Sequence, residues 1–198
     1  MQKNHIGLGQ SKQVNPVKDY SQVVSWLADN YTEVFGYDFY KEVFPDNECS
    51  GELTTDIYKP NAIYIFGGER PDSVQRRIML KDTWKEDYFK YVNDNDFALC
   101  SGLAYRGKAN RLENAQRMYA MIFDLDQVGY VQLRTLFLRF GRMPNSPRSL
   151  PIPTYIVTSG AGLHLYYVFD KPIDLYPNIK LQAKAFKYAL TERRWDPG

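Results

Sequence analysis

Residues 121–126 read Met-Ile-Phe-Asp-Leu-Asp, so two carboxylates, Asp124 and Asp126, follow an apolar run. The run predicts a β-strand, and the two-residue spacing directs both carboxylates to one side of the sheet, with Leu125 facing the core. Charge this close to an apolar interior is costly. That cost favours a functional site over the alternative, in which the aspartates only end a strand and begin a turn. Paired carboxylates suit Mg²⁺ or Mn²⁺, and a two-metal site can hold the attacking and leaving oxygens of phosphoryl transfer.

Residues 159–164 read Ser-Gly-Ala-Gly-Leu-His, a glycine-rich turn that leads into an apolar strand. Glycines permit a tight turn and a close approach to the backbone, so exposed amides at Ser159, Gly160 and Gly162 could hold a triphosphate. His164 begins the next strand and is predicted to point at whatever the turn binds. The alternative is a simple hairpin turn with a satisfied histidine. The chain's other histidine is His5, so a histidine inside this turn, just after an acidic strand, favours a site.

The remaining periodicities predict an α/β chain. Apolar residues recur at intervals of three and four over 17–35, which predicts a helix with Gly36 as its C-terminal stop. Four prolines predict a loop over 141–153, and Lys171-Pro172 is expected to end the last strand. Further helices are expected at 71–92, 110–117, 130–140 and 176–193, and strands at 61–66, 97–105, 118–125, 154–158 and 163–169. For 130–140 a strand is the alternative, because the segment holds β-branched and aromatic residues.

The composition indicates an intracellular domain. With 198 residues and 44% hydrophobic content, the chain can supply a core. Cys49 and Cys100 have no CxxC partner, which argues against a disulfide framework or a zinc ribbon and predicts a reduced, cytoplasmic compartment. No apolar run approaches the roughly 20 residues that span a bilayer, and the N-terminal residues contain no hydrophobic region of a signal peptide. No membrane partner is therefore expected.

The predicted layout is a mobile arm at 1–15 followed by one catalytic domain at 16–198. Within it, 16–95 forms an N-terminal α/β part, and 96–198 bears the acidic pair and the glycine-rich motif. The abrupt end at Gly198 suggests a fragment or a split gene product.

Positive charge gathers around the motifs. The whole chain carries a net charge of +2, whereas residues 106–148 alone hold eight basic and three acidic residues. This local excess is what a groove along a phosphate backbone needs. Arg106, Lys108 and Arg111 are the predicted nucleic-acid contacts.

These motifs resemble the archaeo-eukaryotic primase superfamily, especially the primase-polymerases of phages, plasmids and other mobile elements. The resemblance rests on Asp124-Leu125-Asp126 and on the Ser159–His164 turn, which agree with the family in order and separation. A strand followed by a basic segment at 104–111 is similar to the lead-in of mobile-element members. The likeness extends from about Phe97 to the end.

The resemblance implies a primase-type, RRM-like catalytic core, a mixed sheet with flanking helices, preceded by a small N-terminal α/β subdomain. The implied activity is primer synthesis or DNA polymerisation from NTPs or dNTPs on a single-stranded DNA template, in the replication of a mobile element. Asp124 and Asp126 would hold Mg²⁺ or Mn²⁺, and His164 would contact the incoming phosphates. Asp196 is the candidate third metal carboxylate, unless that residue lies beyond Gly198. Family members often carry a downstream helicase or accessory domain.

Two other classes remain open. A haloacid-dehalogenase-type phosphatase would use Asp124 as nucleophile and Asp126 as acid/base, with Thr158 in its second motif. This chain has no later pair of adjacent acidic residues to bind the metal of such a phosphatase, and that class gives His164 no role. A non-catalytic nucleic-acid-binding replication module is the third class, but it gains nothing from two carboxylates unless metals neutralise them.

Overall fold

The computed structural model describes residues 20–45, 60–67, 74–79, 84–93, 98–106, 110–140, 149–160 and 162–191. The predicted arm at 1–15 lies outside the described residues. The described helices are α1 (Tyr20–Asn30), α2 (Gly36–Val43), α3 (Trp84–Asp87) with a π-helical continuation (Tyr88–Asn93), a 3₁₀ turn (Leu112–Asn114), α4 (Tyr130–Arg139) and α5 (Pro177–Leu190). The strands are β1 (Pro60–Gly67), β2 (Val74–Met79), β3 (Ala98–Arg106), β4 (Ala115–Leu125), β5 (Tyr155–Thr158) and β6 (Leu163–Asp174).

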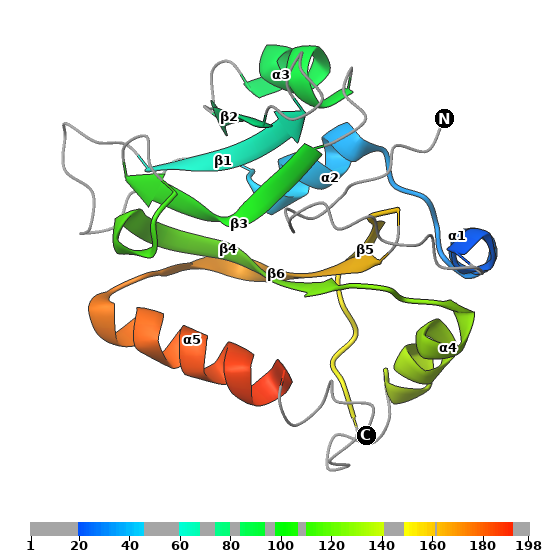
Figure 1. Cartoon of the computed structure of the whole chain (residues 1–198). Helices are drawn as coiled ribbons and strands as arrows, with labels where there is room; N and C mark the ends of the chain where they lie inside the picture. Colours follow the sequence, from blue (N-terminus) through cyan, green and yellow to red (C-terminus); the bar gives the residue numbers. More distant parts are fainter. Residues whose placement is uncertain are drawn as a thin grey trace.

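The six strands form one sheet in the order β2-β1-β3-β4-β6-β5 (Figure 1). All five neighbouring pairs are antiparallel. The predicted α/β character is confirmed, whereas the sheet is antiparallel rather than mixed. Strands β1 and β2, from the N-terminal part of the chain, continue the same sheet that carries the acidic motif.

Strand β4 is held differently along its length, and this positions the site at its C-terminal end. Its register with β3 runs from Tyr105↔Ala115 to Leu103↔Met118. Its register with β6 continues to Leu125↔Leu163. The sheet therefore opens between β3 and β4, and β6 is the strand paired with the last residues of β4 (Figure 1).

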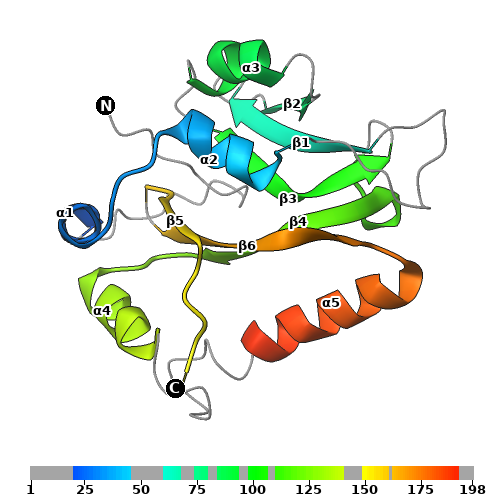
Figure 2. The same cartoon turned by 180° about the vertical axis from the view of Figure 1, so that it is seen from behind.

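Helices cover the two faces of the sheet (Figures 1 and 2). Helix α2 buries its apolar side chains against one face. Helices α1, α4 and α5 contribute to a second core on the other face. The α2 cluster includes Phe39, Tyr40, Val43, Cys100, Tyr119 and Tyr166, and the second includes Val23, Phe123, Leu133, Leu136, Leu163, Leu165 and Leu190. Period-two alternation along β6 explains why Leu165 and Tyr166 belong to different cores.

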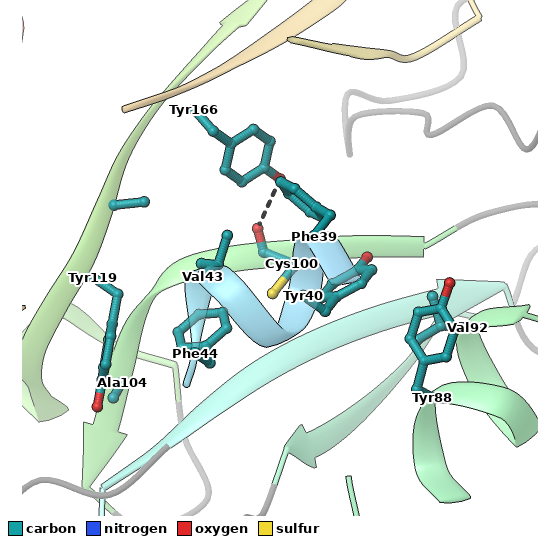
Figure 3. Close-up of a cluster of buried hydrophobic side chains, with 11 residues drawn as sticks. Phe39, Tyr40, Val43, Phe44, Tyr88, Val92, Cys100, Ala104, Tyr119 and Tyr166 are labelled. Atoms are coloured by element: carbon teal, nitrogen blue, oxygen red, sulfur yellow. Dashed lines mark hydrogen bonds between the residues drawn. The ribbon is translucent and has the colours of Figure 1, made fainter. Parts of the chain in front are cut away.

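Tyr166 links β6 to β3 beneath α2. Its buried hydroxyl donates to the Cys100 carbonyl at 3.3 Å, so it bridges the two strands where the sheet opens (Figure 3). We expect Tyr166→Phe to lower the free energy of unfolding by about 1 kcal/mol, because the buried carbonyl loses its donor. Tyr167→Phe is the matched control. The Tyr167 hydroxyl donates to the Pro151 carbonyl at 3.0 Å in an exposed position, where water can replace it. If urea denaturation showed equal losses of the free energy of unfolding in the two variants, this role of the Tyr166 hydroxyl would be contradicted.

The structure corrects the predicted N-terminal helix. The prediction of one helix over 17–35 is wrong beyond Asn30, where α1 ends, and Gly36 begins α2 instead of stopping a helix. The Asn30 side chain donates to the Trp26 carbonyl at 2.7 Å and satisfies one acceptor of the last turn. This local bond competes with continued helix, as asparagine side chains commonly do.

Two further helix predictions are wrong in part. Residues 74–79 form β2, paired with β1, and helix appears only from Trp84. Strand pairing outweighs the local preference there, as tertiary context often does. The predicted helix at 110–117 is reduced to the 3₁₀ turn because β4 begins at Ala115.

The expected break at Lys171-Pro172 does not occur, since β6 continues to Asp174. Its register jumps from Ala120↔Val168 to Met118↔Ile173, so residues 169–172 lie opposite Tyr119. Proline is tolerated in such an irregularity because no ladder hydrogen bond is required of it.

Among the described helices, none has both the length and the apolar content of a membrane-crossing segment.

Candidate functional site

The structure brings Asp124 and His164 together across neighbouring strands. They are direct partners in the β4–β6 register, so their side chains share a face of the sheet. The distance from His164 Nε2 to Asp124 Oδ1 is 3.1 Å. The Asp124 side chain is 51% exposed and that of His164 only 1%. The arrangement is a solvent-accessible carboxylate backed by a buried imidazole.

The imidazole of His164 is not fully satisfied. Its contact with Asp124 lacks the alignment of a hydrogen bond, and neither ring nitrogen has a hydrogen-bond partner among the described residues. Buried polar atoms without partners are rare, because losing water without replacement is costly. A ring in this state is suited to a group that arrives from outside the protein or to a small movement of Asp124.

Asp126 lies just beyond β4 and is exposed. The backbone turns there, since Gln127 has a positive φ of 54°. The glycine-rich turn packs on the same segment. A Cβ added at Gly162 would clash with the Leu125 carbonyl oxygen and lie 3.2 Å from the Asp126 Cα. Only glycine allows the backbone of the turn to approach the acidic pair this closely.

Two of the amides predicted to bind phosphate already have acceptors. The Ser159 N–H donates to the Gly162 carbonyl at 3.0 Å, and the Gly160 N–H donates to the Tyr20 hydroxyl at 3.1 Å. Ser159 is also buried. A phosphate held by these amides would have to replace existing bonds. Ala161, at the tip of the turn, lies outside the described residues.

Lys187 on α5 is a charged neighbour that the sequence gave no reason to choose. Its ammonium lies 5.6 Å from the centre of the ring of Phe123, the residue that precedes Asp124 in the sequence. Desolvation lowers the pKa of Lys187, and the negative charge of Asp124 opposes that shift. A cation therefore stands within electrostatic reach of Asp124. Helix packing alone creates this proximity, so no sequence motif could have indicated it.

The predicted nucleic-acid contacts lie elsewhere. Arg106 ends β3, where the register pairs Tyr105 with Ala115, nine residues before Asp124. At the rise of a β-strand this separation is roughly 30 Å. Arg111 is exposed and lies 3.6 Å from Glu113, while Lys108 is outside the described residues. The structure does not bring Arg106 to the acidic pair, and a template touching both would span several nucleotides.

The described residues offer no third carboxylate beside the pair. Asp196 lies outside them. Asp174 accepts a hydrogen bond from Arg117 Nε at 2.8 Å, and it pairs with Arg117 in the register, roughly 23 Å along β4 from Asp124. In the described part of the chain, no group of three or more potential metal-ligating side chains gathers.

Two carboxylates nevertheless fit one class of metal. Mg²⁺ is often held by one or two carboxylates together with water and substrate phosphates, instead of a complete protein cage. The half-exposed Asp124 and the exposed Asp126 are carboxylates of that kind, although Asp126 does not gather with Asp124 and His164 into one ligand group. They would suit a cation that arrives with a phosphorylated substrate.

Comparisons with protein-family models, curated proteins and solved structures find no match to this chain. The likeness to primase-polymerases therefore rests on the short motifs themselves. What the site can do has to follow from its geometry.

Proposed function

We propose that the chain carries out metal-dependent nucleotidyl transfer on a single-stranded DNA template, using NTPs or dNTPs. The observation that carries the proposal is the cross-strand contact of His164 with Asp124, 3.1 Å from Nε2 to Oδ1. An accessible carboxylate, a second one two residues away and a buried imidazole with unsatisfied nitrogens are groups that such chemistry can use.

The residues have distinct roles in this proposal. Asp124 and Asp126 would hold Mg²⁺ or Mn²⁺, which would supply charge neutralisation for the phosphates and help to activate a 3′ hydroxyl. His164 supports the Asp124 carboxylate by contact from behind, because its ring is buried and Nε2 lies 3.1 Å from Oδ1. Lys187 adds positive charge within electrostatic reach of Asp124, from the α5 side of the sheet. Catalysis then consists mainly of positioning and electrostatic stabilisation.

The two other classes account for fewer of these contacts. A phosphatase that uses Asp124 as a nucleophile has no role for His164, although this ring is the cross-strand partner of Asp124. A pure nucleic-acid-binding module has no role for two accessible carboxylates without a metal, and its predicted contact Arg106 lies at the far end of β4 from them. We therefore propose neither.

His164→Gln tests the proposed role of the imidazole. Glutamine has a polar end but cannot reproduce the rigid ring behind Asp124, so we expect kcat/KM for nucleotide incorporation to fall about a hundredfold, the scale of losing one preorganised electrostatic contact. The measurement is incorporation of labelled nucleotides on a single-stranded template with Mg²⁺ or Mn²⁺.

His5→Gln removes the chain's other histidine and serves as the control, with incorporation expected to be unchanged. Circular dichroism of both variants checks that the fold is retained. Full activity in a folded His164→Gln chain would contradict the role of His164. A wild-type chain that neither incorporates nor binds nucleotides would overturn the proposed function as a whole.

A further inference from the structure

Tyr20 of α1 reaches the glycine-rich turn from a distant part of the chain. Its hydroxyl donates to the Gly162 carbonyl at 2.8 Å and accepts from the Gly160 N–H at 3.1 Å. Its partly buried ring packs against the core shared by α1, α4 and α5. The hydroxyl is therefore fixed by its own ring, and one atom joins the two ends of the turn.

The turn needs this bridge because of its backbone. Gly160 has a φ of 93°, in the left-handed region, and apart from the Tyr20 hydroxyl the described closing bond is Ser159 N–H to the Gly162 carbonyl at 3.0 Å. Gly162 in turn packs on the Leu125 carbonyl and the Asp126 Cα. A continuous set of contacts thus runs from Tyr20 through the turn to the acidic pair.

We infer that Tyr20 is a positioning residue, whose hydroxyl fixes the glycine-rich turn and, through Gly162, holds Asp126 in place relative to Asp124 and His164. The consequence for nucleotide use rests on the proposed function. The double role of donor and acceptor requires a hydroxyl, which phenylalanine lacks. Burial raises the pKa of Tyr20, so the hydroxyl keeps its proton and remains a donor at neutral pH.

Tyr20→Phe tests the contact without any substrate. It keeps the packed ring and removes both hydrogen bonds. We expect the Gly160 amide to exchange with solvent about tenfold faster, the effect of losing one net hydrogen bond, and the Asp126 amide resonance to shift. Tyr31→Phe is the matched control, since Tyr31 follows α1 and contacts the Trp26 and Phe137 rings instead of the turn. Its Gly160 exchange and Asp126 resonance should equal those of the wild type.

The second measurement separates positioning from a general effect on folding. In nucleotide incorporation, Tyr20→Phe should raise the KM for the nucleotide about tenfold, because a loose turn would weaken the hold of Asp126 on the metal–nucleotide complex. A merely structural loss would lower the active fraction, and thus kcat, with KM unchanged; that result would overturn the inference. Unchanged Gly160 exchange and an unshifted Asp126 amide would overturn it whether or not the chain incorporates nucleotides. A wild-type chain with no incorporation would overturn the proposed function. The exchange rate of the Gly160 amide and the shift of the Asp126 amide resonance would still test the role of Tyr20.

Discussion

Replacing both Asp124 and Asp126 with asparagine is expected to lower kcat/KM for nucleotide incorporation by at least about a thousandfold. The amides keep the size of the side chains but lose the two negative charges that would hold the metal. A thousandfold loss corresponds to about 4 kcal/mol of transition-state stabilisation, within the several kcal/mol that a bound metal ion supplies. Binding of Mn²⁺, followed by electron paramagnetic resonance of the free ion, should be lost in parallel.

The fold should tolerate this double change. The Asp124 side chain is 51% exposed and Asp126 is exposed, so neither carboxylate is needed for packing. Asp170→Asn is the matched control, because Asp170 is an exposed carboxylate on β6 outside the site. We expect it to retain both Mn²⁺ binding and incorporation. Normal activity in the folded double variant would contradict the assignment of the acidic pair.

Gly162→Ala is expected to have the largest effect on stability, about 3 kcal/mol in the free energy of unfolding. The added Cβ would meet the Leu125 carbonyl oxygen and lie 3.1 Å from its carbon. Because these are backbone atoms between two paired strands, the clash can be removed only if the turn moves away from β4. Overpacking of well-packed sites costs typically 1–3 kcal/mol, and a clash with backbone belongs at the upper end.

Gly36→Ala is the control for this substitution. A Cβ at Gly36 would also meet an atom closely, but that atom is the Tyr88 hydroxyl in the α2 core and not the backbone of the sheet. Alanine also favours the α2 helix that begins there. We expect a smaller loss than for Gly162→Ala by chemical denaturation. A loss at Gly162→Ala no larger than at Gly36→Ala would show that the turn does not press on the acidic strand.

Local sequence pattern predicts the two strands of the site well. The apolar run before Asp124 and the alternation after His164 specify β4 and most of β6, and the glycines specify the turn between β5 and β6. Pattern alone cannot determine which strands become neighbours. The Asp124↔His164 register arises from the pairing of β4 with β6, which depends on the whole sheet.

The sequence also could not predict contacts made by distant helices. Tyr20 reaches the turn from 140 positions away in the chain, and Lys187 approaches Phe123 only because α5 packs under β4. The opposite error concerns Arg106. It is close in sequence to the acidic pair, yet an extended β4 separates them. Sequence proximity becomes distance when the intervening residues form a strand.

The most direct test of the account is a crystal structure of the full chain with Mn²⁺ and a non-hydrolysable nucleoside triphosphate. The anomalous signal of manganese locates the ion independently of the protein. We expect a peak at bonding distance from carboxylate oxygens of both Asp124 and Asp126, with the triphosphate on the same ion. Manganese and nucleotide bound elsewhere, with Asp124 and Asp126 free of metal, would contradict the proposal.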